Sequence, residues 1–100
     1  MAVKALSDAE ITEQLAPLNN WVRDGDMITK TFKLNSYMAG LAFATAVGTV
    51  SEGQNHHPDM EIGWRKVKVS FTTHDAGSKI TEKDIAVAKA IDALGYPKAE

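Results

Sequence analysis

Apolar and polar residues follow two periods along this chain, one helical and one strand-like, with turn signals between the segments. The first helical segment is predicted to end near Leu15. Its start is marked by Ser7 and Glu10, which have the spacing of a capping box. Pro17 follows and stops the helix, because a proline ring is incompatible with a helix interior.

The next segment has the pattern of a β-hairpin. Residues 21–23 and 27–34 are predicted to be strands, joined by the turn signal Asp24-Gly25-Asp26. Apolar residues at positions 28, 32 and 34 share one face of the returning strand. Lys30 breaks this alternation, which predicts an edge strand or a strand end at that position.

A second hairpin and a final helix are predicted in the second half of the chain. Residues 60–64 and 67–72 alternate in polarity on either side of a turn at Arg65-Lys66. The helix that follows begins with Thr81 as its cap and runs to about Leu94, with an acidic residue three positions after the cap.

A long helix is predicted between the two hairpins, capped by Asn35 or Ser36 and running to about Gln54. Its apolar residues form two stripes, one with Tyr37, Met38, Leu41 and Ala44, and another with Phe43, Ala46, Val47 and Val50. Such a helix must be covered on two sides. We interpret the second cover as another subunit. The alternative is that alanine and glycine let the helix lie close to its own sheet.

The resulting element order is α-β-β-α-β-β-α, which predicts an α+β fold. Two hairpins in one sheet favour four antiparallel strands, with three helices packed on one face. We expect residues 1–100 to form a single domain, because the chain contains no linker, repeat or low-complexity segment.

Composition excludes several classes of protein. A net charge of −2 with mixed signs provides no basic footprint for nucleic acid, and the absence of cysteine excludes disulfides and thiolate metal sites. Residues 34–51 carry no charge, but polar residues and glycines interrupt them, so they indicate a buried helix and not a membrane span. The N-terminus has no apolar run of signal length, and we expect a cytoplasmic protein.

The three histidines of the chain all fall between positions 56 and 74. Histidine both donates and accepts protons near neutral pH, which favours a proton-transfer site. Glu52 and His56 are four residues apart, so we expect Glu52 to support His56 on one helix face. His57 precedes Pro58 and is therefore predicted to leave the helical path. Asp75 lies beside His74 and orients it only if the chain turns there.

Other interpretations of these residues remain open. The His-His-Pro run is also compatible with a polar surface loop, and the three histidines with Asp59 or Glu52 are compatible with a zinc site. Nucleophilic catalysis is disfavoured, since there is no cysteine and no serine in a nucleophile-elbow pattern. Trp21 and Trp64 are predicted to be core or rim aromatics, one of which could stack on a flat ligand.

The spacing of these residues resembles the signature of pterin-4a-carbinolamine dehydratases. The matching positions are Glu52, His56, His57, Pro58, Trp64, His74 and Asp84. The resemblance covers nearly the whole chain. It implies removal of water from 4a-hydroxytetrahydrobiopterin to give quinonoid dihydrobiopterin, in recycling of the cofactor of aromatic amino-acid hydroxylases.

The resemblance also implies the site. Catalytic roles fall to His56, His57 and His74, and contacts with the pterin fall to these three and to Pro58, Thr73, Asp75 and Ala76. Some relatives have cysteine where this chain has Ala76. Glu52 and Asp84 support the site, with Asp84 capping the last helix. No cofactor and no metal are implied.

The implied partners are a pterin substrate and further copies of the chain, as a homodimer or homotetramer through the helix of residues 36–54. Vertebrate members of the family also bind a homeodomain transcription factor. Two functions therefore stand side by side: a dehydratase working by histidine acid–base chemistry, and a non-catalytic dimerisation or assembly cofactor for another protein. We hypothesise that His56 and His74 exchange protons with the substrate while His57 positions it.

Overall fold

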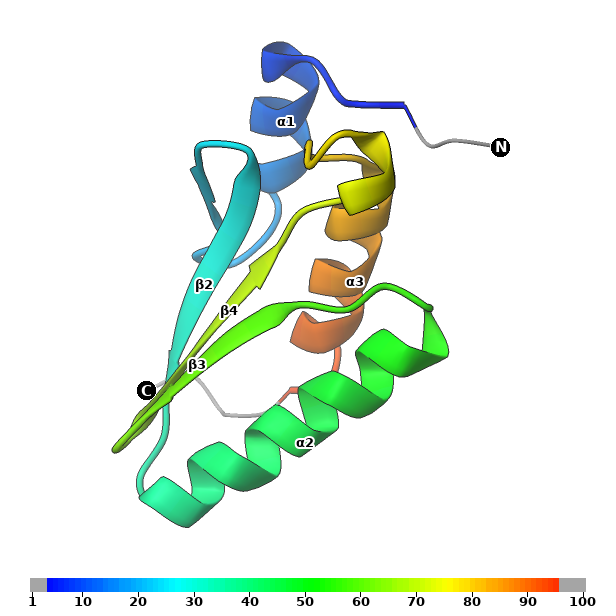
Figure 1. Cartoon of the computed structure of the whole chain (residues 1–100). Helices are drawn as coiled ribbons and strands as arrows, with labels where there is room; N and C mark the ends of the chain where they lie inside the picture. The colour runs from blue at the N-terminus through cyan, green and yellow to red at the C-terminus, as the bar shows by residue number, and fades with distance from the viewer. Residues whose placement is uncertain (1–3, 96–100) are drawn as a thin grey trace.

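The computed structural model describes residues 4–95, which form an antiparallel sheet with helices on one face (Figure 1). Residues 1–3 and 96–100 of the predicted domain lie outside this description. The elements in chain order are α1 (Asp8–Leu15), β1 (Val22–Asp24), β2 (Met27–Lys33), α2 (Tyr37–Gly53), β3 (Asp59–Gly63), β4 (Lys66–Phe71), the short 3-10 helix η1 (His74–Ala76) and α3 (Glu82–Asp92).

The sheet has the strand order β1-β2-β4-β3, and all three strand pairs are antiparallel. The predicted α+β fold is confirmed, with the three long helices in the predicted positions. The two hairpins lie side by side because β2 pairs with β4, with Ile28 opposite Phe71 and Phe32 opposite Val67. These apolar residues point to the helices and bury the inner face of the sheet.

The prediction made from Lys30 is wrong, because β2 lies inside the sheet between β1 and β4. Lys30 points to the helix face, in phase with Ile28 and Phe32, where an apolar residue is expected. Its ammonium group reaches Asp92 of α3 at 3.1 Å, and its charge lies 4.7 Å from the Phe32 ring centroid. The Asp92 carboxylate and the Phe32 ring thus stabilise the Lys30 ammonium group inside the sheet, although the strand pattern alone places this lysine at an edge.

Helix α2 has one covered side and one uncovered side within the chain. Phe43 and Val47 are fully buried against the sheet, as one of the two predicted stripes requires. Of the other stripe, Ala44 is buried and Leu41 is partly buried, whereas Tyr37 and Met38 at the start of the helix are 47% and 68% exposed. In the described part of the chain, no helix has both the length and the apolar character needed to cross a membrane.

The predicted caps of the first and last helices are both present. Ser7 accepts from the backbone of Glu10, while the Glu10 carboxylate accepts from the backbone of Ser7. This backbone bond, with the Ser7 hydroxyl, holds the pKa of Glu10 below its ordinary value. Thr81 caps α3 in the same way, with Asp84 as the reciprocal carboxylate. The second cap matters most, because Asp84 also belongs to the candidate site.

Candidate active site

The end of α2 decides where His56 lies. Gln54 is the C-cap of α2, and Asn55 after it adopts the left-handed conformation with φ 52°. The backbone N–H of His56 then donates to Ser51 O at 3.1 Å, and that of Asn55 donates to Glu52 O at 3.1 Å. These two bonds and the left-handed residue define a Schellman motif. It reverses the chain and turns His56 toward the core.

His56 is consequently an almost buried histidine, 9% exposed. Its ring stacks on Phe71 at the end of β4, with centroids 5.8 Å apart and planes 16° apart. Its Nε2 lies 2.6 Å from Oδ1 of Asp84, which is fully buried at the start of α3. Whenever Asp84 is ionised, this contact requires a proton on Nε2, which leaves Nδ1 as the atom available for other chemistry.

Asp84 connects His56 to the segment that follows β4. Its Oδ2 accepts from the Thr81 backbone N–H at 2.8 Å and from the Thr73 hydroxyl at 2.9 Å. Since the single hydroxyl proton of Thr73 goes to Asp84, the Thr81 hydroxyl must donate to Thr73 Oγ1, 2.6 Å away. One buried carboxylate therefore joins the exit of α2, the exit of β4 and the start of α3.

Glu52 is paired with His57, and the predicted pairing with His56 is wrong. Glu52 Oε1 lies 2.6 Å from Nε2 of His57. The prediction placed both residues on one helix face, whereas α2 ends at Gly53 and the Schellman turn carries His56 away from the face of Glu52. The Glu52–His57 pair is largely open, with side-chain exposures of 78% and 57%. The two adjacent histidines thus have opposite environments, one buried and one facing solvent.

His74 begins η1 immediately after Thr73, and its side chain is exposed. Its Nδ1 lies 3.3 Å from the Ser78 hydroxyl, so the hydroxyl of Ser78, and not Asp75, is the polar group beside the ring. The chain does turn here, with Gly77 at φ 76° and Ser78 at φ 59°. Asp75 is exposed, and the backbone of Ala76 donates to Thr73 O at 3.1 Å.

The structure joins two of the segments that carry predicted site residues at one carboxylate. Thr73 and His56 meet at Asp84, so the segments that carry His57 and His74 are anchored to one carboxylate. Pro58, half-buried, leads from His57 into β3. Within residues 4–95, no three side chains of the metal-binding types are arranged to hold an ion, which removes the geometric support for a zinc site.

Sequence reasoning missed two contributors to this site. Asn55 is the residue that turns His56 inward, and its signal is an asparagine at the position after a helix end, where the left-handed conformation is common. Thr81 was recognised only as a cap, yet its hydroxyl also fixes Thr73. No local pattern identifies that second contact, because it joins residues from different elements.

The site combines a buried carboxylate–imidazole pair with an exposed histidine on each of the two segments that Asp84 joins. Comparison with known proteins gives the family. Residues 4–94 match the sequence profile described as pterin 4 alpha carbinolamine dehydratase, and the chain belongs to this family.

The curated relatives match over most of their own length. A protein from Roseiflexus sp. (strain RS-1) is 49% identical over 89 residues, covering 89% of this chain and 95% of the relative. One from Natronomonas pharaonis is 52% identical over 89 residues, covering 89% and 94%. Both carry the provisional name pterin-4-alpha-carbinolamine dehydratase.

Two solved structures share the fold. A transcriptional coactivator/pterin dehydratase from Brucella melitensis superposes with a TM-score of 0.83 at 27% identity, covering 91% of this chain and 98% of the other. A pterin dehydratase-like protein, described as a RuBisCO assembly factor in the alpha-carboxysome, superposes with a TM-score of 0.63 at 28% identity, covering 78% and 92%.

Proposed function

We propose that this protein dehydrates 4a-hydroxytetrahydrobiopterin, the pterin-4a-carbinolamine, to quinonoid dihydrobiopterin and water. The observation that carries the proposal is the hydrogen-bonded set around Asp84, which fixes His56 and anchors the segments of His57 and His74. Family membership supplies the substrate class. Proton transfer by positioned histidines supplies the chemistry.

The reaction breaks one C–O bond and moves two protons. The hydroxyl at C4a is a poor leaving group as hydroxide, so a general acid protonates the oxygen as the C–O bond breaks. The lone pair of a ring nitrogen forms the new C=N bond, and a base removes the proton left on the ring. Each well-placed proton transfer contributes typically about 10²–10⁴-fold in rate.

The roles follow from the environments of the three rings. His56 is held rigidly by Asp84 and Phe71, which suits an imidazole that exchanges a proton through Nδ1 in a fixed direction. His74 is exposed and free to approach the substrate from the η1 side. His57, tethered to Glu52, positions the pterin together with Pro58. Thr73, Asp75 and Ala76 form the remaining contact segment.

The assay is dehydration of freshly generated carbinolamine, measured against the uncatalysed rate. The protein is expected to accelerate the reaction, and treatment with a chelator is expected to leave the acceleration unchanged, because the proposed steps use only imidazoles. Absence of acceleration at micromolar protein overturns the dehydratase proposal. Loss of activity on chelation, with recovery on adding zinc, overturns the metal-free mechanism.

We propose a second role in assembly, through the exposed apolar residues at the start of α2. Tyr37 and Met38 are exposed although both are large and apolar, and Leu41 on the same stripe is only partly buried. Apolar surface of this kind is stabilised by association. The descriptions of the two solved relatives, a coactivator and an assembly factor, agree with such a role. The proposed association is a homodimer or homotetramer through α2, on which a transcription factor or a hydroxylase could also dock.

The variant Met38→Glu tests this interface. It is expected to lower the mass measured by light scattering to that of a smaller assembly, because burying an unpaired carboxylate costs several kcal/mol. The matched control is Val22→Glu, which places the same charge on another exposed apolar position, 55% exposed on β1. A wild-type protein that is monomeric at micromolar concentration, or a Met38→Glu variant of unchanged mass, contradicts the proposed interface.

A further inference from the structure

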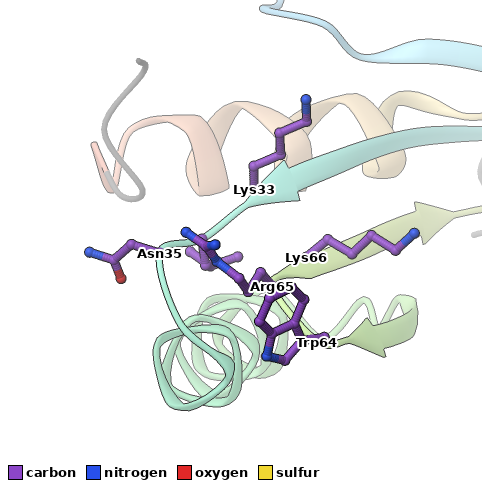
Figure 2. A pocket seen from close by; sticks show the side chains of 6 residues that line it. Lys33, Asn35, Trp64, Arg65 and Lys66 are labelled. Carbon is purple, nitrogen blue, oxygen red and sulfur yellow. The ribbon is translucent and has the colours of Figure 1, made fainter.

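A hollow lies at the opposite end of β4 from the histidines. It is enclosed by the β2–α2 connection and the β3–β4 turn, and its volume is about 520 Å³. Its lining residues are Lys33, Leu34, Asn35, Trp64, Arg65 and Lys66 (Figure 2). The site residues Thr73 and His74 follow the other end of β4, a strand of six residues that spans about 20 Å. The hollow is therefore separate from the proposed catalytic site.

The lining is cationic, with three positive side chains and no carboxylate. Among the described residues, Arg23, Lys30 and Lys79 form ion pairs with aspartates. Within residues 4–95, none of the three cations of the hollow has such a partner. The protein as a whole carries a net charge of −2, so this end is positive against an acidic background.

The strand register explains why these charges stay uncompensated. Lys66 lies opposite Lys33 on β2 and opposite Gly63 on β3, so neither neighbouring strand offers it a carboxylate. The next outward-facing lysine of β4, Lys68, has Glu61 opposite. Like charges directly opposite one another destabilise a sheet. An anion bound between Lys33 and Lys66 removes the repulsion between them, and this relief adds to the affinity of the hollow for anions.

Trp64 supplies an apolar contact in the middle of the cationic lining. It is 74% exposed, whereas Trp21 is 3% exposed and belongs to the core. The guanidinium of Arg65 lies 5.3 Å from the Trp64 ring centroid, a cation–π contact that holds both side chains in place. Trp64 is part of the signature spacing of the sequence, yet it takes no part in the hydrogen bonds around Asp84.

The adjacent helix strengthens the positive potential. The first turns of α1 and α3 each contain two acidic residues, whereas the first turn of α2 contains none. No acidic residue therefore neutralises the positive end of the α2 dipole in its first turn, which begins at Tyr37, two residues after Asn35.

We propose that this hollow is a docking site for an extended acidic peptide segment of a partner protein. The side chains of Lys33 and Lys66 diverge in Figure 2, and Arg65 points toward Asn35, so the charges are spread along the surface. Spread charges match carboxylates placed along an extended chain better than one compact phosphate. An apolar residue of the segment contacts Trp64, as exposed tryptophans do at binding hot spots. Three cations on an acidic protein give a nucleic acid too few phosphate contacts.

The first test screens an array of twelve-residue peptides in which leucine or phenylalanine is placed at varied spacing among glutamates, lysines or serines. The acidic series is expected to bind the wild-type protein, with affinity falling as salt is raised, and to protect Trp64 from quenching by acrylamide. The buried Trp21 contributes little to that signal. No preference for acidic over basic and neutral peptides overturns the proposal.

The second test changes the hollow. The double variant Lys33→Glu/Lys66→Glu, and separately Trp64→Ala, are each expected to weaken binding of the best acidic peptide by at least about tenfold. The matched control is Lys83→Glu/Lys89→Glu, which makes the same change in net charge at two exposed positions of α3. Equal weakening by this control means that binding follows net charge alone and overturns the proposal. Thermal unfolding of each variant verifies that it is folded.

Two other occupants give distinct results. The first is nucleic acid. If a single-stranded oligonucleotide binds more tightly than any acidic peptide, and this binding is lost in the same variants, the hollow is a nucleic-acid site and the proposal is overturned. Light scattering tests the other occupant, a second copy of the chain. If Lys33→Glu/Lys66→Glu changes the mass of the protein's own assembly, the hollow is a contact between copies and the peptide proposal is overturned. Neither result depends on whether the protein dehydrates a pterin.

Discussion

The variant His74→Ala is expected to lower kcat for carbinolamine dehydration by about 10²–10⁴-fold, the usual contribution of a positioned acid or base. The temperature of thermal unfolding should stay nearly unchanged, because the His74 ring is exposed and its one polar contact within residues 4–95 is the 3.3 Å approach to Ser78. Steady-state kinetics and a thermal scan on the same preparation measure both effects.

The control for this variant is Ser78→Gly. It removes the hydroxyl beside His74 and suits the positive φ of that position, so the loop is retained. Its effect on kcat is expected to be within about tenfold, since a neutral hydrogen bond contributes only about 0.5–1.5 kcal/mol. A His74→Ala enzyme with the full wild-type rate contradicts a proton-transfer role for this residue.

The variant Asp84→Asn is expected to keep the fold and lose at least about 100-fold in kcat. The asparagine oxygen can still accept from Thr73 and Thr81, which directs its NH₂ group at His56. Nε2 of His56 must then be an acceptor, and the proton moves to Nδ1. Asp84 is therefore expected to act as a positioning residue, and ¹⁵N shifts of the His56 ring should report the exchanged tautomer.

The stability effect separates this variant from Asp84→Ala. Alanine leaves several donors without an acceptor at a fully buried position, and the expected loss is about 3–5 kcal/mol of unfolding free energy. The matched control is Asp92→Asn on the same helix, a carboxylate that accepts from Trp21 and pairs with Lys30, away from the histidines. It should lower stability and leave kcat unchanged. Full activity of Asp84→Asn, or an unchanged His56 tautomer, contradicts the positioning role.

The element order was predictable because its signals are local. The caps are set by residues three positions apart or fewer. The structure confirms Ser7 and Thr81, and of the two candidates Asn35 and Ser36 it selects Ser36. The antiparallel hairpins follow from short turns between alternating strands. The three histidines were also identified from the sequence, because their clustering and spacing are properties of the chain itself.

The partners of the histidines were less predictable. The helix ends close to the predicted residue, but Asn55 then adopts the left-handed conformation and turns His56 away from the helix face of Glu52. The carboxylate predicted for His56, Glu52, therefore belongs to His57. The true partner of His56, Asp84, lies 28 residues along the chain and appeared in the sequence as a cap.

The sequence by itself determined the order of the elements, the family resemblance and the three histidines that are proposed to carry protons. Only the tertiary structure decided which carboxylate meets which imidazole, that Lys30 lies inside the sheet beside Asp92, and that Trp21 is buried while Trp64 is exposed. The physical reason is the range of the interactions. Caps and turns act over a few residues, whereas burial and buried ion pairs depend on elements that meet only after the sheet and helices have packed.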